Sequence, residues 1–400
     1  MKRTRIAAID VGTTKVCTIM ADTDGSSLPR ILGVGVAPCG GLHKGLVVNF
    51  NEAKESIRES IRKAEETAGH RLESAYVGVT GAHISSANNR GVIAITRNDR
   101  KVSSKDLKRV LEVARSIKIP DDRKLLHVIP RTYIIDGEVG VGNPVGMHGS
   151  RVDIEAHIIS AAVTAVQNLT KCIRGVGVEI DDLVAESLAS AEAVLTEEEK
   201  QNGIVLADIG GGTTDIAVFK DNSIYYTSVL PVGGQLISRD ISVGLNIPLD
   251  LAEGLKMRYG NAMPVHDMGE TDKTMTEDGH TISYSTFCEI IRIRVEELLR
   301  LILMELPRGE HTNFIPAGVV LTGGTANLPG IVELGSEVTR LPVRIGTPIK
   351  LPGVADIFSD PAYATGVGLL LWKAKNNDTQ GWEGEGGLRG FISRVFRVFR

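Results

Sequence analysis

Residues 204–215 read IVLADIGGGTTD, an apolar strand that ends in an acidic residue and enters a glycine-rich turn. An earlier segment, residues 6–14, follows the same plan in the letters IAAIDVGTT. The two segments lie about half the chain apart, and such internal repetition predicts a core built from two related halves. Each half should contain a strand, a tight turn and a second strand that leads away from it.

Both turns contain the residue types that bind phosphate groups. Glycine lets backbone N–H groups approach phosphate oxygens because no Cβ stands in the way. Threonine hydroxyls donate further hydrogen bonds, and Lys15 adds a positive charge. Asp10 and Asp208, one at each strand end, can hold Mg²⁺ through the waters of the ion. The alternative is that each segment is an ordinary β-turn, but this does not explain the repeat.

A third strand runs into glycines at residues 319–327, which read VVLTGGTAN. A Gly-Gly turn of this kind suits the flat face of a nucleoside, although a plain strand-to-helix turn would have the same letters. The GxxxxGK[ST] motif of P-loop proteins does not occur in the sequence. Two phosphate-binding turns and a nucleoside-binding turn together predict a site for a nucleoside triphosphate.

These three segments resemble the phosphate-1, phosphate-2 and adenosine motifs of the actin/Hsp70/sugar-kinase superfamily. The resemblance implies an α/β fold, actin-like and two-lobed, in which two ribonuclease-H-like domains enclose ATP and Mg²⁺. The cofactor-binding residues that it implies are Gly12, Thr13, Thr14 and Lys15 in phosphate 1, Gly210, Gly211, Gly212 and Thr213 in phosphate 2, and Gly323, Gly324 and Asn327 in the adenosine motif.

The same resemblance implies further roles around the nucleotide. Glu253 and Lys256 match an E-x-x-K pair that flanks the nucleoside, and Glu186 stands where a hinge helix positions the attacking water. Asp10, Glu186 and Asp208 are therefore the candidate catalytic residues. Where relatives have Glu-Pro at the hinge, this chain has Glu186-Ser187, and Asn327 replaces an arginine that lies against adenine in Hsp70-like proteins. We expect ATP hydrolysis to be slow at most.

Five shorter segments narrow the resemblance to one family. They are residues 41–47 (GLHKGLV), 126–130 (LHVIP), 142–147 (GNPVGM), 155–157 (EAH) and 230–234 (LPVGG). They resemble the FtsA family of bacterial cell-division proteins, over nearly the whole chain. That resemblance implies a polymerising adaptor at the division site, on the cytoplasmic face of the membrane. Its implied partners are other copies of itself, the C-terminal peptide of the tubulin-like FtsZ, later division proteins and anionic lipids.

The strand and helix patterns also predict a division into subdomains. Residues 85–159 interrupt the regular α/β order and are interpreted as an inserted α+β subdomain, with a catalytic lid as the alternative. Residues 121–123 within it are expected to form a solvated turn. The expected units are 1–85, 161–200 and 350–375 (subdomain 1A), 86–160 (inserted 1C), 201–240 and 305–349 (2A), 241–304 (2B), 376–387 (linker) and 388–400 (C-terminal amphipathic helix).

Residues 388–400, LRGFISRVFRVFR, contain no acidic residue and separate into two faces on a helical wheel. A basic, aromatic amphipathic helix is typical of an interfacial membrane anchor. The alternative is a helix that docks on its own protein. The candidate membrane-binding residues are the apolar Leu388, Phe391, Ile392, Val395, Phe396 and Phe399 and the basic Arg389, Arg394, Arg397 and Arg400.

Composition excludes several other classes of function. A net charge of −4 disfavours nucleic acid as a partner, and the four cysteines form no CxxC pair. No apolar run is long enough to span a bilayer, which needs about 20 residues, so we expect a peripheral protein. Two alternatives remain: a kinase or chaperone-type ATPase with the same cleft, and a pilus-assembly platform protein of the same fold. Neither would need the basic amphipathic tail.

Overall fold

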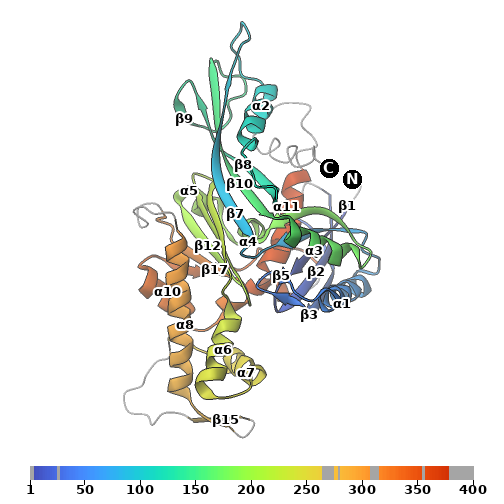
Figure 1. Cartoon of the computed structure of the whole chain (residues 1–400), viewed down its shortest axis with the longest axis vertical. Coiled ribbons are helices and arrows are strands. Elements are labelled where there is room, and N and C mark those ends of the chain that lie inside the picture. The colour runs from blue at the N-terminus through green and yellow to red at the C-terminus, as the bar shows by residue number, and fades with distance from the viewer. Residues whose placement is uncertain are drawn as a thin grey trace.

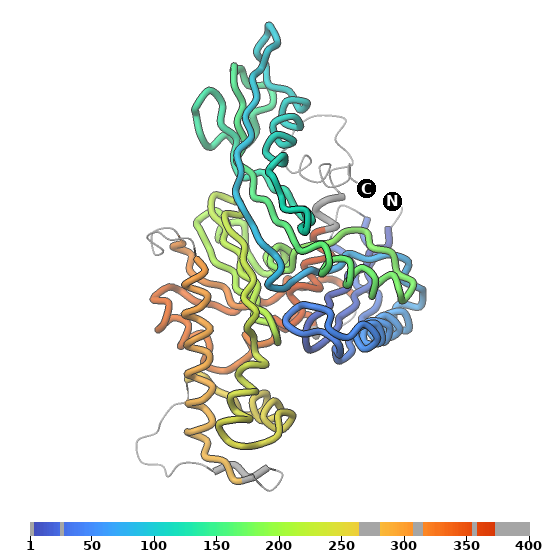
Figure 2. Tube along the Cα trace, viewed as in Figure 1, coloured from blue at the N-terminus to red at the C-terminus, as the bar shows by residue number. Residues whose placement is uncertain are grey.

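The computed structural model describes residues 4–24, 28–263, 274–277, 280–306, 315–353 and 356–377. Two lobes lie side by side, and a smaller unit stands at one end of the molecule (Figure 1). Figure 2 shows the chain passing from the first lobe into the smaller unit, back to the first lobe and then into the second lobe. This is the predicted two-lobed α/β arrangement.

The first lobe contains a five-stranded sheet with the strand order β11-β6-β1-β2-β3. The first three strands of the chain are antiparallel neighbours, whereas β6 and β11 run parallel to β1. Successive residues of β1 point to opposite faces, so Ala7 and Ile9 pack against α1 and α3, while Ile6 and Ala8 pack toward α4 and α11. The elements are β1 (Thr4–Val11), β2 (Lys15–Thr23), β3 (Arg30–Pro38), α1 (Phe50–Ala68), β6 (Ser74–Val79), α3 (Val163–Arg174), β11 (Glu179–Ala185), α4 (Glu186–Val194) and α11 (Ala364–Asn377).

The second lobe repeats this plan. Its sheet has the order β14-β13-β12-β17-β18, again with three antiparallel strands followed by two parallel ones. One face packs on α6, α8 and α10, and the other shares a core with α4 and α11, which therefore lie between the two sheets. The elements are α5 (Glu197–Asn202), β12 (Ile204–Ile209), β13 (Thr214–Lys220), β14 (Ser223–Leu230), α6 (Gly234–Leu245), α7 (Leu249–Tyr259), α8 (Tyr284–Glu305), β17 (Val319–Thr322), α10 (Ile331–Thr339) and β18 (Val343–Ile345).

The smaller unit is an antiparallel sheet, β7-β10-β8-β9, with α2 packed on one face. Residues 92–96 read VIAIT, and this run of β-type residues predicts a strand there. The structure has β7 from Ile84 to Ala94, so the prediction was wrong in extent. The misleading feature was the polar run of residues 85–90, which has no apolar alternation. The elements are β7 (Ile84–Ala94), α2 (Ser104–Arg115), β8 (Arg123–Ile135), β9 (Glu138–Val141) and β10 (Arg151–Ala162).

Polar side chains join this unit to the second lobe, because β7 lies beside the edge strand β14. Ser86 Oγ donates to the carbonyl of Thr227 (2.7 Å), and Asn88 Nδ2 donates to the carbonyl of Tyr225 (3.1 Å). The buried His157 of β10 contacts Asn88 Oδ1 (2.7 Å) and Thr227 Oγ1 (3.0 Å). Side chains therefore satisfy edge carbonyls that would otherwise lack a neighbouring strand. We call these five residues the polar seam.

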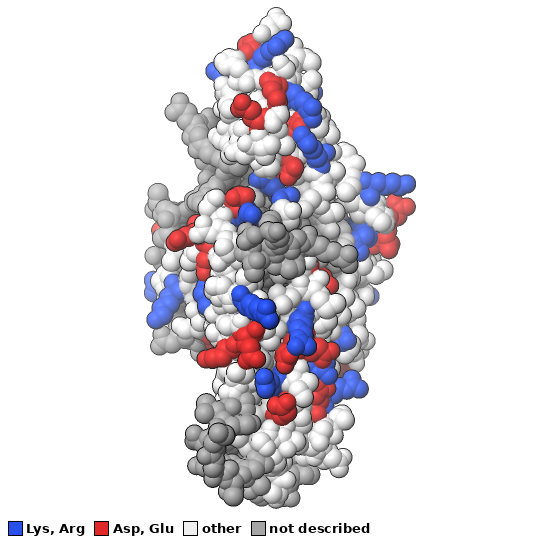
Figure 3. Space-filling view, turned by 90° about the vertical axis from the view of Figure 1, so that its left-hand side faces the viewer, with Lys and Arg blue, Asp and Glu red and all other residues white. Residues whose placement is uncertain are grey.

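Short elements complete the described chain. They are β4 (Leu42–His43), β5 (Leu46–Val47), β15 (Thr274–Glu277), β16 (His280–Ser283), η1 (Gly324–Asn327), η2 (Asp356–Ser359) and η3 (Pro361–Tyr363). Arg123, expected in a solvated turn, instead begins β8 and donates to the carbonyls of His83 and Ser160, each at 2.9 Å. Acidic and basic side chains are interspersed on the face of the molecule shown in Figure 3.

The predicted linker and tail fall almost entirely outside the described residues. Helix α11 continues through residues 376 and 377, so the linker prediction was wrong for these two positions, which are helical. The remaining linker residues and the predicted membrane-binding helix over 388–400 lie outside the described residues. Within the described residues, no helix combines the length and apolar character needed to cross a bilayer.

Candidate functional site

The two glycine turns of the repeated segments face each other between the lobes. Each turn is closed by the same backbone hydrogen bond, from Gly12 N to Lys15 O (3.0 Å) and from Gly210 N to Thr213 O (2.9 Å). A Cβ added to Gly211 would lie 2.4 Å from Thr14 Cγ2. The turns are therefore in close contact, and only glycine fits on the second-lobe side.

A cavity of about 480 Å³ opens beside these turns. This volume lies within the usual range for small-molecule sites, about 300–1,000 Å³. The structure brings together at this cavity every predicted catalytic and cofactor-binding residue except Gly212, which packs against Thr13 instead. The lining residues that the sequence singled out are Asp10, Gly12, Thr13, Thr14, Lys15, Glu186, Asp208, Gly210, Gly211, Thr213, Glu253, Lys256, Gly323, Gly324 and Asn327.

Four buried carboxyl groups line this cavity: Asp10, Glu186, Asp208 and Asp215. Burial raises the pKa of Asp10 to about 7, although Lys15 opposes the shift. Burial also raises the pKa values of Glu186 and Asp215 well above their ordinary values, and the neighbouring carboxylates add to this. Asp208 shifts upward less strongly, since Ser190 and Thr365 donate hydrogen bonds to its Oδ2. A cluster of this kind favours a cation.

Two carboxylate oxygens in this cluster are orphaned. Glu186 Oε1 and Asp215 Oδ1 are buried without a hydrogen-bond partner among the described residues. Within the part of the chain that the structure describes, no three His, Cys, Asp or Glu side chains are grouped so as to bind a metal ion directly. Asp10 and Asp208 at the two strand ends, beside the Asp215 Oδ1 that has no partner among the described residues, fit a hydrated Mg²⁺, which keeps most of its waters.

Asp215 was missed by the reasoning from sequence. Its Oδ2 accepts a hydrogen bond from Thr80 Oγ1 at 2.6 Å, and Thr80 follows β6 in the first lobe. This contact links the two lobes at the floor of the cavity. The available signal was the second aspartate of the DIGGGTTD segment, which lies opposite Asp208 across the β12–β13 pair.

Lys15 points to the short turn η3 rather than standing free. Its Nζ donates to the carbonyl of Ala362 at 2.7 Å and lies 3.7 Å from the centre of the Tyr363 ring. Its positive charge therefore has a cation–π contact as well as a hydrogen bond. The sequence predicted a positive charge at Lys15, but no sequence pattern indicated that η3 would bind this side chain.

Glu253 and Lys256 occupy the other end of the cavity, on α7. Lys256 Nζ lies 2.7 Å from Glu253 Oε2 and donates to Ser238 Oγ (2.9 Å) and to the carbonyl of Gly234 (3.1 Å). Ser238 also donates to Glu253. The E-x-x-K pair is thus tied to the start of α6, which fixes the distance of α7 from the glycine turn.

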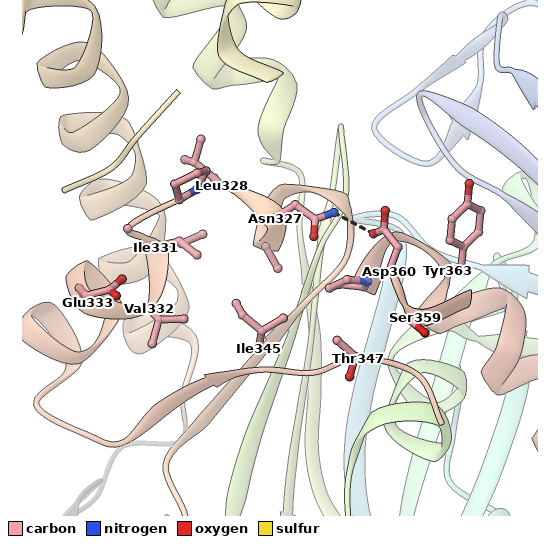
Figure 4. A pocket seen from close by; sticks show the side chains of 14 residues that line it. Asn327, Leu328, Ile331, Val332, Glu333, Ile345, Thr347, Ser359, Asp360 and Tyr363 are labelled. Carbon is pink, nitrogen blue, oxygen red and sulfur yellow. Dashed lines mark hydrogen bonds between the residues drawn. The ribbon is translucent and has the colours of Figure 1, made fainter. Parts of the chain in front are cut away.

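Asn327, at the end of the third glycine segment, also lines a wider cavity of about 850 Å³ (Figure 4). Asn327 Nδ2 donates to Asp360 Oδ1 at 2.7 Å, and both residues line both cavities. Apolar side chains of Leu328, Ile331 and Ile345 lie on the second-lobe side of the wider cavity. An amide–carboxylate pair with apolar neighbours can hold a flat, polar-edged ring.

Gly323 and Gly324 differ in how much space surrounds them. Gly323 has a φ of +84°, and a Cβ there would lie 2.4 Å from Asp208 Oδ1. Gly324 has a φ in the ordinary range, and the nearest atom to its added Cβ is Ala362 Cβ at 3.7 Å. Position 324 can therefore carry a methyl group without disturbing the protein, whereas position 323 cannot.

Two duplicated sheets around a glycine-lined cleft define an actin-like protein. Solved structures agree with this fold. One is a PilM-PilN type IV pilus biogenesis complex, with a TM-score of 0.65 and 17% identity over 92% of this chain and 98% of that one. Another is MreB5 of Spiroplasma citri bound to ADP, with a TM-score of 0.56 and 15% identity over 95% and 99%.

Sequence comparison gives the particular family. A family model described as "Cell division protein FtsA" matches residues 205–368, and one described as "SHS2 domain inserted in FTSA" matches residues 81–160. The FtsA of Pseudomonas aeruginosa is 41% identical over 92% of this chain and 88% of its own length. That of Neisseria meningitidis is 38% identical over 97% of both. The chain belongs to the FtsA family and is an actin-like cell-division protein.

Proposed function

We propose that the cleft binds ATP together with Mg²⁺. The observation that carries this proposal is the pair of glycine turns that face each other between the lobes, with Asp10 and Asp208 at their strand ends. Their backbone N–H groups and threonine hydroxyls are the donors for phosphate oxygens. The structures of MreB5 with the same fold were solved bound to ADP and to AMPPNP, which supports nucleotide binding by this chain.

Asp10 and Asp208 would hold Mg²⁺ through its waters, and the ion would neutralise charge on the phosphates. Lys15 would share the phosphate end, while Glu253, Lys256 and Asn327 would flank the nucleoside. The wider cavity beyond Asn327 and Asp360 gives the base room without a stacked arginine. Weaker selectivity for the base follows from this arrangement.

Hydrolysis in this cleft should be slow. Glu186 is the candidate for orienting the attacking water, but the hinge has Ser187 where relatives have proline, so we expect this water to be oriented poorly. A nucleotide that is hydrolysed slowly serves as a structural ligand that holds the lobes together. We therefore assign the nucleotide to the control of assembly rather than to rapid turnover.

At the level of the cell, we propose a polymerising adaptor that tethers the FtsZ ring to the cytoplasmic face of the membrane. Family membership supports this role. The chain would bind the C-terminal peptide of FtsZ, other copies of itself and later division proteins, and the basic tail over 388–400 would bind anionic lipids. The proposed subdomain division, with 1C at 86–160, has support from the inserted-domain match at 81–160.

Isothermal titration calorimetry of Mg·ATP tests the nucleotide proposal. Asp208→Ala should abolish binding, because it removes one of the two metal anchors. Gly324→Ala should weaken binding at least tenfold, because its methyl group would meet only the nucleoside. Gly142→Ala, at a position with open space around it in the inserted unit, is the matched control and should bind as wild type. Unchanged affinity in both cleft variants would contradict the proposal.

A further inference from the structure

A third, very small cavity adjoins Glu186. Its volume is about 10 Å³, and Glu186 lines both this cavity and the large one. About 10–15 Å³ is the volume that one water molecule needs, provided that polar partners surround it. His83 and Thr80 line the small cavity together with Glu186, so polar groups are present.

Three buried polar atoms at this place have no hydrogen-bond partner in the described part of the chain. They are Glu186 Oε1 and both ring nitrogens of His83, Nδ1 and Nε2. Leaving a buried donor or acceptor unpaired costs about 1–3 kcal/mol, and such orphans are rare in native proteins. Two side chains with this defect at one water-sized cavity indicate a shared partner.

The two side chains can be placed relative to the backbone at the end of β6. Glu186 Oε1 would lie 3.0 Å from a Cβ on Gly78, and His83 Nδ1 would lie 2.7 Å from a Cβ on Gly81. Both groups therefore pack directly against glycines at the end of β6. The backbone of His83 is held by a hydrogen bond, because Arg123 donates to its main-chain carbonyl at 2.9 Å.

We propose that one water molecule bridges His83 and Glu186, and that His83 thereby positions the Glu186 carboxyl. The water accepts from the imidazole N–H and donates to Glu186 Oε1. The other carboxyl oxygen is then left for the cleft, where the attacking water would stand. This inference rests on the proposed function, and it makes His83 a positioning residue rather than a catalytic one.

The charge state of His83 agrees with this role. Burial and, second, the nearby Arg123 lower the pKa of His83, so the ring is neutral and carries one N–H and one lone pair. A neutral ring can donate to the water without placing a second positive charge beside Arg123. The sequence offered no sign of this contact, since His83 stands alone among residues with no catalytic spacing.

A crystal structure of the wild-type chain at about 1.5 Å tests the bridge directly. We expect one ordered water within hydrogen-bond distance of Glu186 Oε1 and of one His83 nitrogen. An empty cavity, or a His83 ring bonded elsewhere, would overturn the proposal. The His83→Leu variant should lack this water, because leucine fills a similar volume without a donor.

Single-turnover hydrolysis of ATP, measured beside calorimetric ATP binding, tests the positioning role. His83→Leu should slow the chemical step about tenfold, the equivalent of one lost hydrogen bond, with ATP affinity unchanged. His83→Gln keeps an N–H donor and should restore most of the rate. His148→Gln, at an exposed site in the inserted unit, is the control.

The possible failures can be told apart. Loss of ATP binding in the wild-type chain would overturn the proposed function itself. Intact binding with equal rates in wild type and His83→Leu would overturn the positioning role alone. A wild-type chain that binds ATP but never hydrolyses it would also overturn that role, because Glu186 would then orient no water.

Discussion

Buried carboxyl groups set the chemistry of the cleft. Asp10, Glu186, Asp208 and Asp215 lie together, and the positive charge of Lys15 lowers the pKa values of Asp10 and Asp208 against the effect of burial. Two oxygens of the cluster have no hydrogen-bond partner among the described residues. Without a cation, each ionisation takes place against burial and against like charge. A bound Mg²⁺ would oppose the repulsion among these carboxylates, so metal binding and their ionisation should support each other.

Replacing Asp215 with asparagine tests this repulsion. The folded-state pKa of Asp215 is raised, so the folded protein holds its proton longer than the unfolded chain does, and stability falls as the pH rises. The Asp215→Asn variant does not ionise at this position, so it avoids this fall in stability, and its amide oxygen can still accept the hydrogen bond from Thr80. In the absence of Mg²⁺ we expect it to raise the free energy of unfolding by about 1–3 kcal/mol at pH 8, and by less at pH 5.

Chemical denaturation at the two pH values measures this effect. Asp121→Asn, at an exposed turn, is the control and should change stability little at either pH. Equal stability of wild type and Asp215→Asn at pH 8 would show that the buried carboxylates do not destabilise one another.

Among the elements, the β7–β14 contact joins the inserted unit to the second lobe through side chains. Asn88 Nδ2 donates to the carbonyl of Tyr225, so Asn88 Oδ1 faces His157 and must accept from Nδ1–H. The Nε2 of His157 then accepts from the Thr227 hydroxyl. The polar seam is therefore a closed chain of hydrogen bonds that starts and ends on β14, and it requires a neutral imidazole.

The neutral state of His157 makes the seam sensitive to acid. Burial is the main cause that lowers its pKa to about 3, and the charges of Arg131 and His127 add to the effect. The unfolded chain, with a pKa near 6.5, takes up the proton first as the pH falls, so stability is full above about pH 6.5 and is lost toward pH 3. Through this one histidine, the free energy of unfolding should be about 2 kcal/mol lower at pH 5 than at pH 8.

Urea denaturation from pH 8 to pH 5 measures this dependence. His157→Gln should be less stable than wild type at pH 8, because it disturbs the seam, but its stability should fall less steeply with acid. His43→Gln, at an exposed site, should follow the wild-type curve. If the free energy of unfolding falls equally with pH in wild type and in His157→Gln, the assignment of His157 as a buried, neutral imidazole is contradicted.

The C-terminal segment is the element on which the proposed membrane role depends. Burial of its apolar face should contribute several kcal/mol, at about 25 cal/mol per Å², whereas each arginine contributes about 1 kcal/mol and is screened by salt. Phe391→Glu combined with Phe399→Glu should release the protein from anionic vesicles at any salt concentration. Replacing Arg389 and Arg394 with Gln should weaken binding mainly at low salt.

Vesicle flotation at two salt concentrations separates these effects. If the double-glutamate variant still floats with the vesicles, the segment is not an anchor, and a helix docked on its own protein becomes the better interpretation.

For the molecule as a whole, the repeated segment predicted the right architecture because it recurs in the strands that begin each sheet. The apolar residues of 249–259 recur at helical spacing and predict a helix over this range, and α7 has these bounds, Leu249–Tyr259. Contacts between segments that are distant in the chain could not be predicted from such local patterns. Thr80 with Asp215, and Lys15 with η3, join residues more than a hundred positions apart, and no local pattern marks either pair. Polar residues of the seam look solvent-exposed in sequence, because only the neighbouring lobe covers them.

The two-lobed molecule should hold its nucleotide much longer than an ordinary enzyme does. The hinge has Ser187 where relatives have proline, so we expect Glu186 to orient the attacking water poorly. We expect steady-state hydrolysis far below the ~10 s⁻¹ that is typical of enzymes. A coupled phosphate-release assay measures this rate, and turnover near that value would favour a kinase or chaperone-type ATPase.

Co-sedimentation of FtsZ with anionic vesicles tests the adaptor function most directly. The full chain with Mg·ATP should carry FtsZ into the vesicle pellet, and a chain that lacks residues 388–400 should leave FtsZ in the supernatant. Asp208→Ala should reduce recovery even with the tail present, because nucleotide-dependent assembly multiplies weak membrane contacts. Recovery of FtsZ that is the same with and without the tail, or that never rises above vesicles alone, would contradict the account.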